Sequence, residues 1–377
     1  MKDQKLFLHS ALFAAFAACV AAMAFAQSSD ANPPKATTPS PALLVLSKQN
    51  HTLAIVDPAS LRVVGRVPVG DDPHEVVASA DGRTAYVSNY GFGAFHTLAV
   101  IDLIGQEPEP QIDLGPLRGP HGLAFANGRV WFTAEAAKAI GSIDPGSKTV
   151  NWIMGTGQNR THMIYVFPDA KKILTTNVNS ATVTILEHTD RPAGGPTGPP
   201  PGAGNWQGAG VPPPGSRGPG GPPPGPPGGD WIETVIPVGG GSEGFDVTPD
   251  GRQAWVANAW DGTISVIDIA QKKATATLHA NARGANRLKF TPDGSRALIS
   301  VGAELVVFDV ATQKELKRLR IGYRGGGGIQ MQPDGQRAYV AFAQDSFVAV
   351  IDLKTLEVVG KIDAGGNPDG MAWAVQQ

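Results

Sequence analysis

Short runs of β-branched and aromatic residues, separated by turn residues, recur along most of this chain. In one unit, a Pro-Asp-Gly turn at 249–251 precedes an apolar run at 254–258 and a second run that ends at 266–268. Similar units begin at turns 80–82 and 333–335. Asp-Gly supplies the left-handed residue that a hairpin needs, and β-branched and aromatic residues favour strands. The pattern therefore predicts an all-β domain of short antiparallel strands.

The units recur with a period of about 42 residues, which is long enough for four short strands and their turns. A four-stranded unit cannot bury both faces alone, so units must stack, and radial stacking gives the blades of a β-propeller. First strands begin near seven positions: His74, His121, His162, Glu243, Asn286, Gly327 and Asp369. The last has no second strand after it, whereas residues 42–70 supply three strands without a first one. We therefore predict one seven-bladed β-propeller over residues 41–377, with its terminal blade closed by N- and C-terminal strands.

Three sequence elements occur in a fixed order within the units. They are the Pro-Asp-Gly turn, a Tyr-Val-x-Asn strand end and a Val-Ile-Asp strand, as at residues 333–335, 86–89 and 350–352. In this order and at this period, they make residues 41–377 similar to the YVTN β-propeller repeat family. The Gly-His and Gly-Gly signatures of WD40 and kelch repeats do not recur. The resemblance implies an extracytoplasmic binding or scaffold propeller, and it implies no common reaction.

The first 26 residues have the pattern of a secretory signal peptide. Two lysines precede an apolar run over residues 6–26, which ends in Ala-Phe-Ala. We predict cleavage after Ala26, a disordered spacer over 27–40, and a periplasmic or secreted mature protein. Two alternatives are a lipidated N-terminus at Cys19 and an uncleaved run that spans a bilayer. Cys19 is the only cysteine, so the cleaved chain would contain no disulfide.

Residues 191–229 depart from the repeat pattern, because they form a Pro/Gly-rich tract between a third and a fourth strand. The proline triplets at 199–201 and 222–224 are typical of flexible or polyproline II segments, and glycine lacks the strict spacing of collagen. Loops between third and fourth strands lie on the face opposite to the loops that enter first strands. We therefore predict a surface insertion on the face away from the ligand site.

Composition and charge narrow the range of partners. Only 17% of residues are charged and the net charge is −2, so the chain lacks the basic field that attracts nucleic acid or anionic lipid. The motifs of serine hydrolases and of covalent c-type haem are also missing from the sequence. A small molecule, a peptide or a cell-envelope component remains as the partner. We expect a monomer, without a transmembrane domain in the mature chain and without nucleic acid.

One residue per blade occupies the same position near the start of the first strand, where first strands line the central channel. In ring order these residues are Asp369, His74, His121, His162, Glu243, Asn286 and Gly327. The first five offer imidazoles and carboxylates, which suit zinc, manganese, iron or copper. We predict that this arc is a binding site for one divalent metal ion, with an affinity that falls as the imidazoles become protonated near about pH 6.

A second group of polar side chains falls on the same face, and we predict that it binds the ligand or orients the histidines. Its members are Asn89, Glu135, Asn177 and Asn258 at the ends of second strands, Arg160, Arg283 and Arg324 in loops that enter first strands, and Asn286. The arginines suit an anionic or carbonyl-bearing ligand beside the metal. The simpler interpretation is a hydrated channel in which these asparagines satisfy turn amides.

Two main classes of function stay open. The first is a binding or scaffold module that uses its central channel face. The second is a metal-dependent hydrolase or lyase similar to the gluconolactonases and streptogramin lyases, with a His/carboxylate site at the channel mouth. A redox role with copper or haem is a third interpretation. The sequence assigns no catalytic residue.

Overall fold

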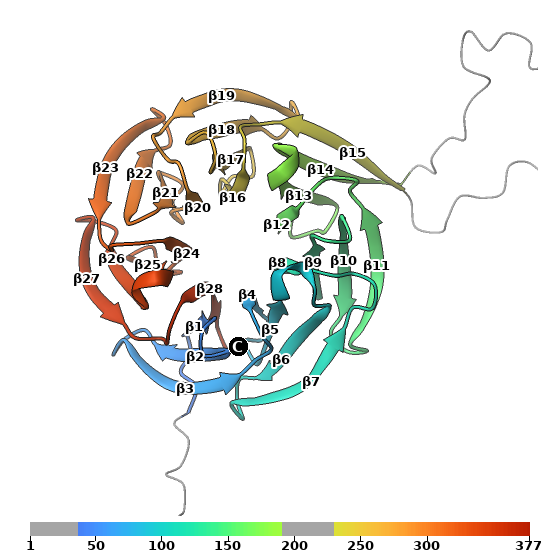
Figure 1. Ribbon diagram of the computed structural model, residues 1–377, viewed down its shortest axis with the longest axis vertical. Coiled ribbons are helices and arrows are strands. Elements are labelled where there is room, and N and C mark those ends of the chain that lie inside the picture. Colours follow the sequence, from blue (N-terminus) through green and yellow to red (C-terminus); the bar gives the residue numbers. More distant parts are fainter. Residues whose placement is uncertain (1–36, 191–229) are drawn as a thin grey trace, which may run out of the picture. The chain divides into compact units, whose positions relative to one another are not determined.

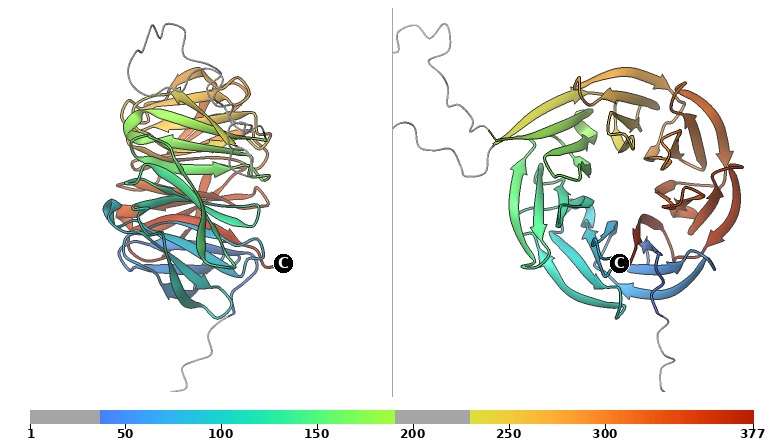
Figure 2. Two further views of the ribbon diagram at one scale, coloured as in Figure 1. Left: turned by 90° about the vertical axis from the view of Figure 1, so that its right-hand side faces the viewer. Right: turned by 180° about the vertical axis from the view of Figure 1, so that it is seen from behind.

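The computed structural model describes residues 37–190 and 230–377 of the chain. These residues form seven four-stranded antiparallel sheets around a common axis (Figure 1), and Figure 2 shows the same ring from the side and from behind. The predicted all-β, seven-bladed propeller is therefore confirmed. Within the described residues, no helix is long and apolar enough to cross a membrane. The predicted signal peptide (1–26), most of the predicted spacer (27–40) and the Pro/Gly tract (191–229) lie outside the described residues.

Each blade runs from a strand beside the axis to a strand at the rim. The innermost strands are β4 (Pro73–Ala78), β8 (Pro120–Ala126), β12 (Thr161–Val166), β16 (Ser242–Val247), β20 (Ala285–Phe290), β24 (Gly326–Met331) and β28 (Pro368–Ala374). The second strands are β5 (Thr84–Asn89), β9 (Arg129–Ala134), β13 (Lys172–Asn177), β17 (Gln253–Asn258), β21 (Arg296–Val301), β25 (Arg337–Phe342) and β1 (Ala42–Ser47).

The outer half of each blade follows in chain order. The third strands are β6 (Thr97–Asp102), β10 (Ala139–Asp144), β14 (Thr182–Thr189), β18 (Thr263–Asp268), β22 (Glu304–Asp309), β26 (Phe347–Asp352) and β2 (Thr52–Asp57). The rim strands are β7 (Glu107–Asp113), β11 (Thr149–Gly155), β15 (Asp230–Pro237), β19 (Lys273–His279), β23 (Lys314–Arg320), β27 (Glu357–Ile362) and β3 (Arg62–Pro68). We call the sheet β28-β1-β2-β3 blade I, the sheet β4–β7 blade II, and so on to blade VII, which is β24–β27.

Blade I joins the two ends of the described ring. Strand β28 pairs with β1 in antiparallel register, with Leu43 opposite Trp373 and Val45 opposite Met371. Trp373 Nε1 also donates a hydrogen bond to the Met331 carbonyl of blade VII at 2.6 Å. As predicted, strands from opposite ends of the sequence complete one blade, so no gap is left between blades VII and II.

The hydrophobic core lies between neighbouring blades. Second and third strands are covered on both faces, so their side chains are almost continuously buried, and Trp255, Tyr339 and Phe132 are among the largest fully buried ones. Rim strands instead alternate between exposed and half-buried positions, as in β19. Because each blade buries its faces only against its two neighbours, the ring must be complete before every blade is covered.

The Asp-Gly turns explain why the first and second strands of each unit are so sharply connected. Gly82 and Gly251 adopt φ values of 67° and 72°, in the left-handed region that glycine tolerates best. Asp81 Oδ1 accepts a hydrogen bond from the Arg83 backbone N–H at 3.1 Å, and Asp250 Oδ1 accepts one from Arg252 at 3.0 Å. The motif therefore fixes the turn, and with it the register of the inner hairpin.

Glycines allow some inner strands to approach closely near the axis. A Cβ atom on Gly122 of β8 would lie 2.6 Å from the His162 carbonyl oxygen, and one on Gly244 of β16 would lie 2.5 Å from the Asn286 carbonyl oxygen. Neither distance is sterically acceptable. These positions must be glycine if the next inner strand is to remain where it is.

Hydroxyl groups on second strands bridge the same blade boundaries. Thr133 Oγ1 of β9 donates to the His162 carbonyl at 2.7 Å and accepts from Gly122 N–H at 2.8 Å. Thr176 Oγ1 of β13 makes the equivalent bond to the Glu243 carbonyl at 2.9 Å. The backbone position of each of these inner-strand residues is therefore set by the preceding blade.

Strands β14 and β15 flank the Pro/Gly tract. They pair from Thr182 opposite Pro237 to Thr189 opposite Asp230. Thr182 is also paired with Asn177, at the strand end nearest the start of the inner strand. The tract therefore leaves and re-enters the blade at the opposite strand end, and its own location remains a prediction.

Candidate functional site

Three histidine rings form a row near the axis. His74, His121 and His162 are the second residues of the inner strands of blades II, III and IV. The ring centroids lie 4.5 Å apart for His74 and His121, and 3.9 Å apart for His121 and His162. Equivalent positions in consecutive blades have thus become direct neighbours.

The two predicted acidic residues flank this row. Glu243 Oε2 lies 2.6 Å from His162 Nε2, and Asp369 Oδ2 lies 3.7 Å from His74 Nδ1. The structure therefore brings together all five residues that were predicted to form one arc. Their contacts nevertheless divide them into two groups, one around His162 and one around His74.

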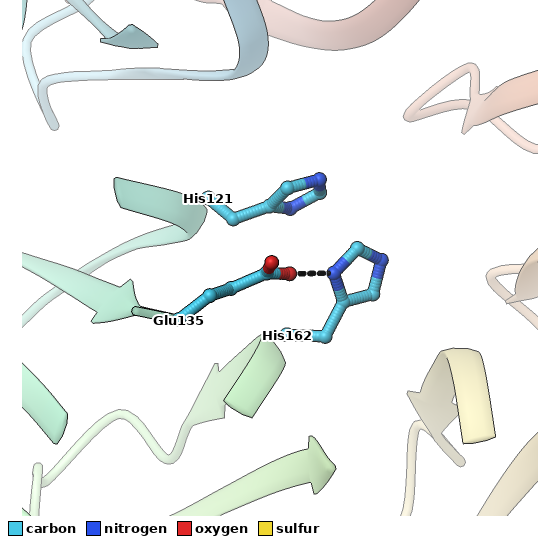
Figure 3. Close-up of side chains that lie close together, drawn as sticks. All are labelled: His121, Glu135 and His162. Carbon is cyan, nitrogen blue, oxygen red and sulfur yellow. Dashed lines mark hydrogen bonds and ion pairs between the residues drawn. The ribbon is translucent and has the colours of Figure 1, made fainter. Parts of the chain in front are cut away.

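The first group is a cluster of metal-ligand types formed by His121, Glu135 and His162, which we call the HEH cluster (Figure 3). One ligand atom from each residue lies within 4.8 Å of the other two. The residues are only 2%, 6% and 2% exposed, respectively. Glu135 Oε1 accepts a hydrogen bond from His162 Nδ1, whereas the buried His121 Nδ1 has no hydrogen-bond partner in the described part of the chain.

Charges around His162 keep it protonated. Burial alone would lower the pKa of His162, but the carboxylates of Glu243 and Glu135 raise it to about 9. Burial would likewise raise the pKa of Glu243, but His162 lowers it to about 2. At neutral pH the cluster therefore contains an imidazolium between two carboxylates.

His121 behaves in the opposite way. Burial, and then the positive charge of His162, hold the pKa of His121 well below its ordinary value. His121 is therefore a neutral imidazole with a lone pair available at neutral pH. The sequence had led us to expect that the imidazoles become protonated together near pH 6. Their pKa values instead shift in opposite directions, because two carboxylates contact His162 directly, whereas His121 is buried beside the charged His162.

Two further side chains contact the carboxylates of this cluster. The Tyr90 hydroxyl donates to Glu135 Oε2 at 2.7 Å, and burial followed by this hydrogen bond raises the pKa of Tyr90. Arg160 Nε lies 3.5 Å from Glu135 Oε2, and Arg160 Nη1 lies 3.4 Å from Glu243 Oε1. Both carboxylates thus face His162 through one oxygen and Arg160 through the other.

The second group already contains a cation. Lys48 Nζ, from the loop after β1, lies 2.6 Å from His74 Nε2, 3.2 Å from Asp72 Oδ1 and 3.6 Å from Asp369 Oδ2. The contact to His74 is a hydrogen bond, in which Nε2 accepts when His74 carries its proton on Nδ1, and the two carboxylates form ion pairs with the ammonium group. The His74 end of the arc therefore holds a lysine ammonium within hydrogen-bond distance of the imidazole. The HEH cluster is the better candidate for metal, because its three ligand atoms lie within 4.8 Å of one another.

An ion pair crosses the interior of the ring next to these groups. Arg287 of β20 contacts Glu75 of β4, which belong to the non-adjacent blades VI and II. The Arg287 side chain is only 7% exposed, and its Nη1 also donates to Asn286 Oδ1 at 2.9 Å. Burial opposes the charge, but Glu75, Asp369 and Glu243 raise the pKa of Arg287. This ion pair connects opposite sides of the ring. Glu75 and Arg287 are the third residues of their inner strands, directly after the position that the histidines occupy.

The asparagines predicted at second-strand ends lie in a different environment. Asn89, Asn177 and Asn258 are buried, and each donates through Nδ2 to a threonine of the third strand, at 3.0, 3.1 and 2.9 Å respectively. These hydrogen bonds hold the hairpin between second and third strands. Glu135, at the corresponding strand end of blade III, is the member of this set that reaches a histidine.

Of the three predicted arginines, one contacts the HEH cluster. Arg160 contacts the HEH cluster, whereas Arg283 and Arg324 are exposed, and their side chains form no ion pair within the described residues. Asn286 lies at the predicted inner-strand position, where its side chain accepts from Arg287. Gly327 leaves its position without a side chain.

Sequence reasoning missed several residues that shape the site, namely Lys48, Asp72, Glu75, Tyr90 and Arg287. A signal existed for two of them. Glu75 and Arg287 occupy the inner-strand position that is glycine in four other blades, at Gly122, Gly244, Gly328 and Gly370. Two long, oppositely charged side chains at a position that is glycine in four of the other five blades indicate a contact across the axis.

Comparison with known proteins supports the fold. No protein-family model matches the chain, and no curated protein matches it. A functionally unknown protein from Desulfotomaculum acetoxidans superposes with a TM-score of 0.67 at 13% identity, covering 90% of this chain and 100% of that one. The hydrazine synthase of Kuenenia stuttgartiensis gives a TM-score of 0.61 at 16% identity, covering 86% and 98%.

A third similar structure is the dihydro-heme d1 dehydrogenase NirN in complex with DHE. It gives a TM-score of 0.59 at 15% identity, covering 90% of this chain and 76% of that one. Structural similarity at sequence identities this low supports a shared ring architecture and does not support a shared chemistry. The chain is thus a seven-bladed β-propeller whose structural neighbours include enzymes and a protein of unknown function.

Proposed function

We propose that this protein is an exported propeller of the YVTN type that binds a divalent metal ion in the HEH cluster and acts as a metal-dependent binding module. One observation carries the proposal. His121 Nδ1 is buried without a hydrogen-bond partner, and His121 lies in a cluster whose ligand atoms are within 4.8 Å of one another. Buried polar atoms normally have partners, so an unpaired nitrogen beside a carboxylate indicates a missing ligand.

The donor set determines which ions fit. Two imidazoles and a carboxylate suit zinc, manganese, iron and copper, and they suit calcium or magnesium poorly. Glu243 lies beside His162, with Oε2 2.6 Å from His162 Nε2, and is a further carboxylate next to the cluster. Because His162 is protonated at pH 7, metal binding has to release its proton.

We expect the double variant H121A/H162Q to bind Zn²⁺ and Mn²⁺ at least about 100-fold more weakly than the unmodified chain, since two of three ligands are lost. Isothermal titration calorimetry of the mature protein measures this change. The matched control replaces His51 and His96, two half-exposed histidines outside the cluster, and should bind as the unmodified chain does. Equal metal binding by H121A/H162Q and the unmodified chain would rule out the HEH cluster.

The same titration tests the role of His162 when it is repeated between pH 7 and pH 9. The pKa of His162 is raised, so its proton competes with the metal throughout this range. Affinity should rise about tenfold per pH unit and level off near about pH 9. An affinity that is independent of pH above 7 would show that His162 is not a ligand.

A metal-dependent hydrolase or lyase is the second candidate, and the Lys48–His74 pair favours it. Lys48 Nζ lies 2.6 Å from His74 Nε2, and the His74 ring contacts His121. Groups able to carry a proton therefore lie beside the proposed metal site. Zn²⁺- or Mn²⁺-dependent opening of simple lactones, lost in H74A while metal affinity is kept, would establish this function in place of simple binding.

We propose export on the basis of the N-terminal sequence. Cleavage between Ala26 and Gln27 should give a mature chain that begins at Gln27, because the apolar run ends there in small residues. N-terminal sequencing of protein from the periplasm or medium measures this directly. The variant A24L/A26L should remain uncleaved, and a lipid attached to Cys19 would identify a lipoprotein instead.

A further inference from the structure

Arg160 occupies the position of a second cation in the HEH cluster. The carboxylates of Glu135 and Glu243 each use one oxygen for His162. Their remaining oxygens face Arg160, at 3.5 Å from Nε and 3.4 Å from Nη1. Each of the two carboxylates is thus shared between His162 and the Arg160 guanidinium, so both oxygens of each already have a partner.

The side chain of Arg160 is weakly held. Each contact is longer than 3.3 Å, and each joins one nitrogen to one oxygen instead of forming a bidentate pair. The side chain is 36% exposed, whereas that of Arg287 is 7% exposed and hydrogen-bonded to Asn286 and Glu75. Both carboxylate partners are nearly buried, but Arg160 reaches them from the more exposed side through two long, single contacts. Arg160 is therefore held more loosely than Arg287.

The backbone of Arg160 is fixed even though its side chain is not. Its carbonyl accepts a hydrogen bond from Val178 N–H at 3.0 Å, and the next residue back, Asn159, donates to Ser180 Oγ at 2.9 Å. Arg160 adopts a left-handed φ of 58°, which a side chain keeps only when the surrounding structure holds it. The guanidinium can therefore swing away while the loop stays in place.

We propose that Arg160 is a displaceable counter-cation that gates the HEH cluster and sets its selectivity for metal ions. This inference rests on the proposed metal site. When Arg160 contacts the carboxylates, their second oxygens are occupied, and a metal ion binds only if it displaces the guanidinium. Monovalent ions are excluded because such an ion carries the same single charge as the guanidinium, which is already attached to the protein.

The test compares R160Q with R160K in Mn²⁺ titrations at pH 7. R160Q keeps a polar side chain but shortens it and removes its charge, so Mn²⁺ should bind about tenfold more tightly or better. R160K keeps a charge and should stay close to the unmodified protein. R283Q and R324Q are the matched controls, since both arginines are exposed and make no ion pair within the described residues, and neither should change the affinity.

A second readout follows Arg160 itself. This experiment uses NMR with diamagnetic Zn²⁺ in place of Mn²⁺. When Zn²⁺ saturates the site, the Nε–H resonance of Arg160 should move toward its chemical shift in free arginine, because the guanidinium leaves Glu135. An affinity of R160Q equal to or weaker than that of the unmodified protein overturns the gate while leaving the metal site intact. Metal binding by neither protein overturns both the site and the gate, and thermal melting shows that each variant is folded.

Discussion

Removal of residues 368–377 is expected to abolish the cooperative unfolding of the whole domain. The deletion removes β28, which pairs with β1 and packs between the inner strands of blades VII and II. Blade I is then left with three strands, and the buried faces of its two neighbours lose their cover. Since every blade depends on the next for burial, the loss spreads around the ring. Thermal melting followed by circular dichroism measures the change.

The matched control removes only residues 375–377, which follow β28. This shorter deletion keeps all seven sheets and should lower the melting temperature by a few degrees at most. Limited proteolysis should then cut the longer truncation throughout the ring and leave the control intact. A longer truncation that melts like the control would mean that the ring is held together without β28.

Replacing Arg287 with alanine should destabilise the domain by about 3–5 kcal/mol, because it leaves Glu75 as an unpaired charge in the interior of the ring. The Arg287 side chain is only 7% exposed, and within the described residues Glu75 has no other ion-pair partner. Urea unfolding at pH 7 gives the free energy of unfolding. The exposed Arg283, two residues before the start of β20, provides the control, and R283A should change the free energy little.

The double variant R287M/E75M separates charge from packing. With both partners apolar and of similar length, most of the lost stability should return, because the cost in R287A comes mainly from the uncompensated carboxylate. A double variant as unstable as R287A would show that the guanidinium stabilises the ring through packing and its bond to Asn286 instead.

The fold was accessible from the sequence because its signals are local and repeated. Each unit combines a turn such as Pro249-Asp250-Gly251 with strands of the right length, and these features depend only on neighbouring residues. Closure could also be predicted, because Ala42–Ser47 and Pro368–Ala374 are complementary fragments of one unit. Repetition averages out the local ambiguity that limits predictions from a single strand.

The adjacency of His74, His121 and His162 followed from the same symmetry. What symmetry could not provide is which groups surround each of them. The asparagines at 89, 177 and 258 were aligned correctly with Glu135, but their shorter side chains stop at the third-strand hydroxyls, whereas Glu135 reaches His162. Side-chain length therefore separated residues that the alignment had treated alike.

Groups from loops were the least predictable. Lys48 and Tyr90 follow second strands and reach residues of the next blade. Their contacts depend on loop conformations that no repeat specifies, such as the left-handed residues around Phe92 that place a backbone N–H on Asp72. The protonation of His162 was missed for the same reason, because it depends on two carboxylates that come from different blades.

The bonds across blade boundaries bear on how such a site can be inherited. His162 belongs to blade IV, but its carbonyl is held by Thr133 and its ring by Glu135, both from blade III. A gene that grows by duplicating one repeat would copy the histidine without its supports, or the supports without the histidine. The smallest segment that can carry this chemistry into another ring is therefore a junction between two repeats, and selection on the site acts on pairs of neighbours.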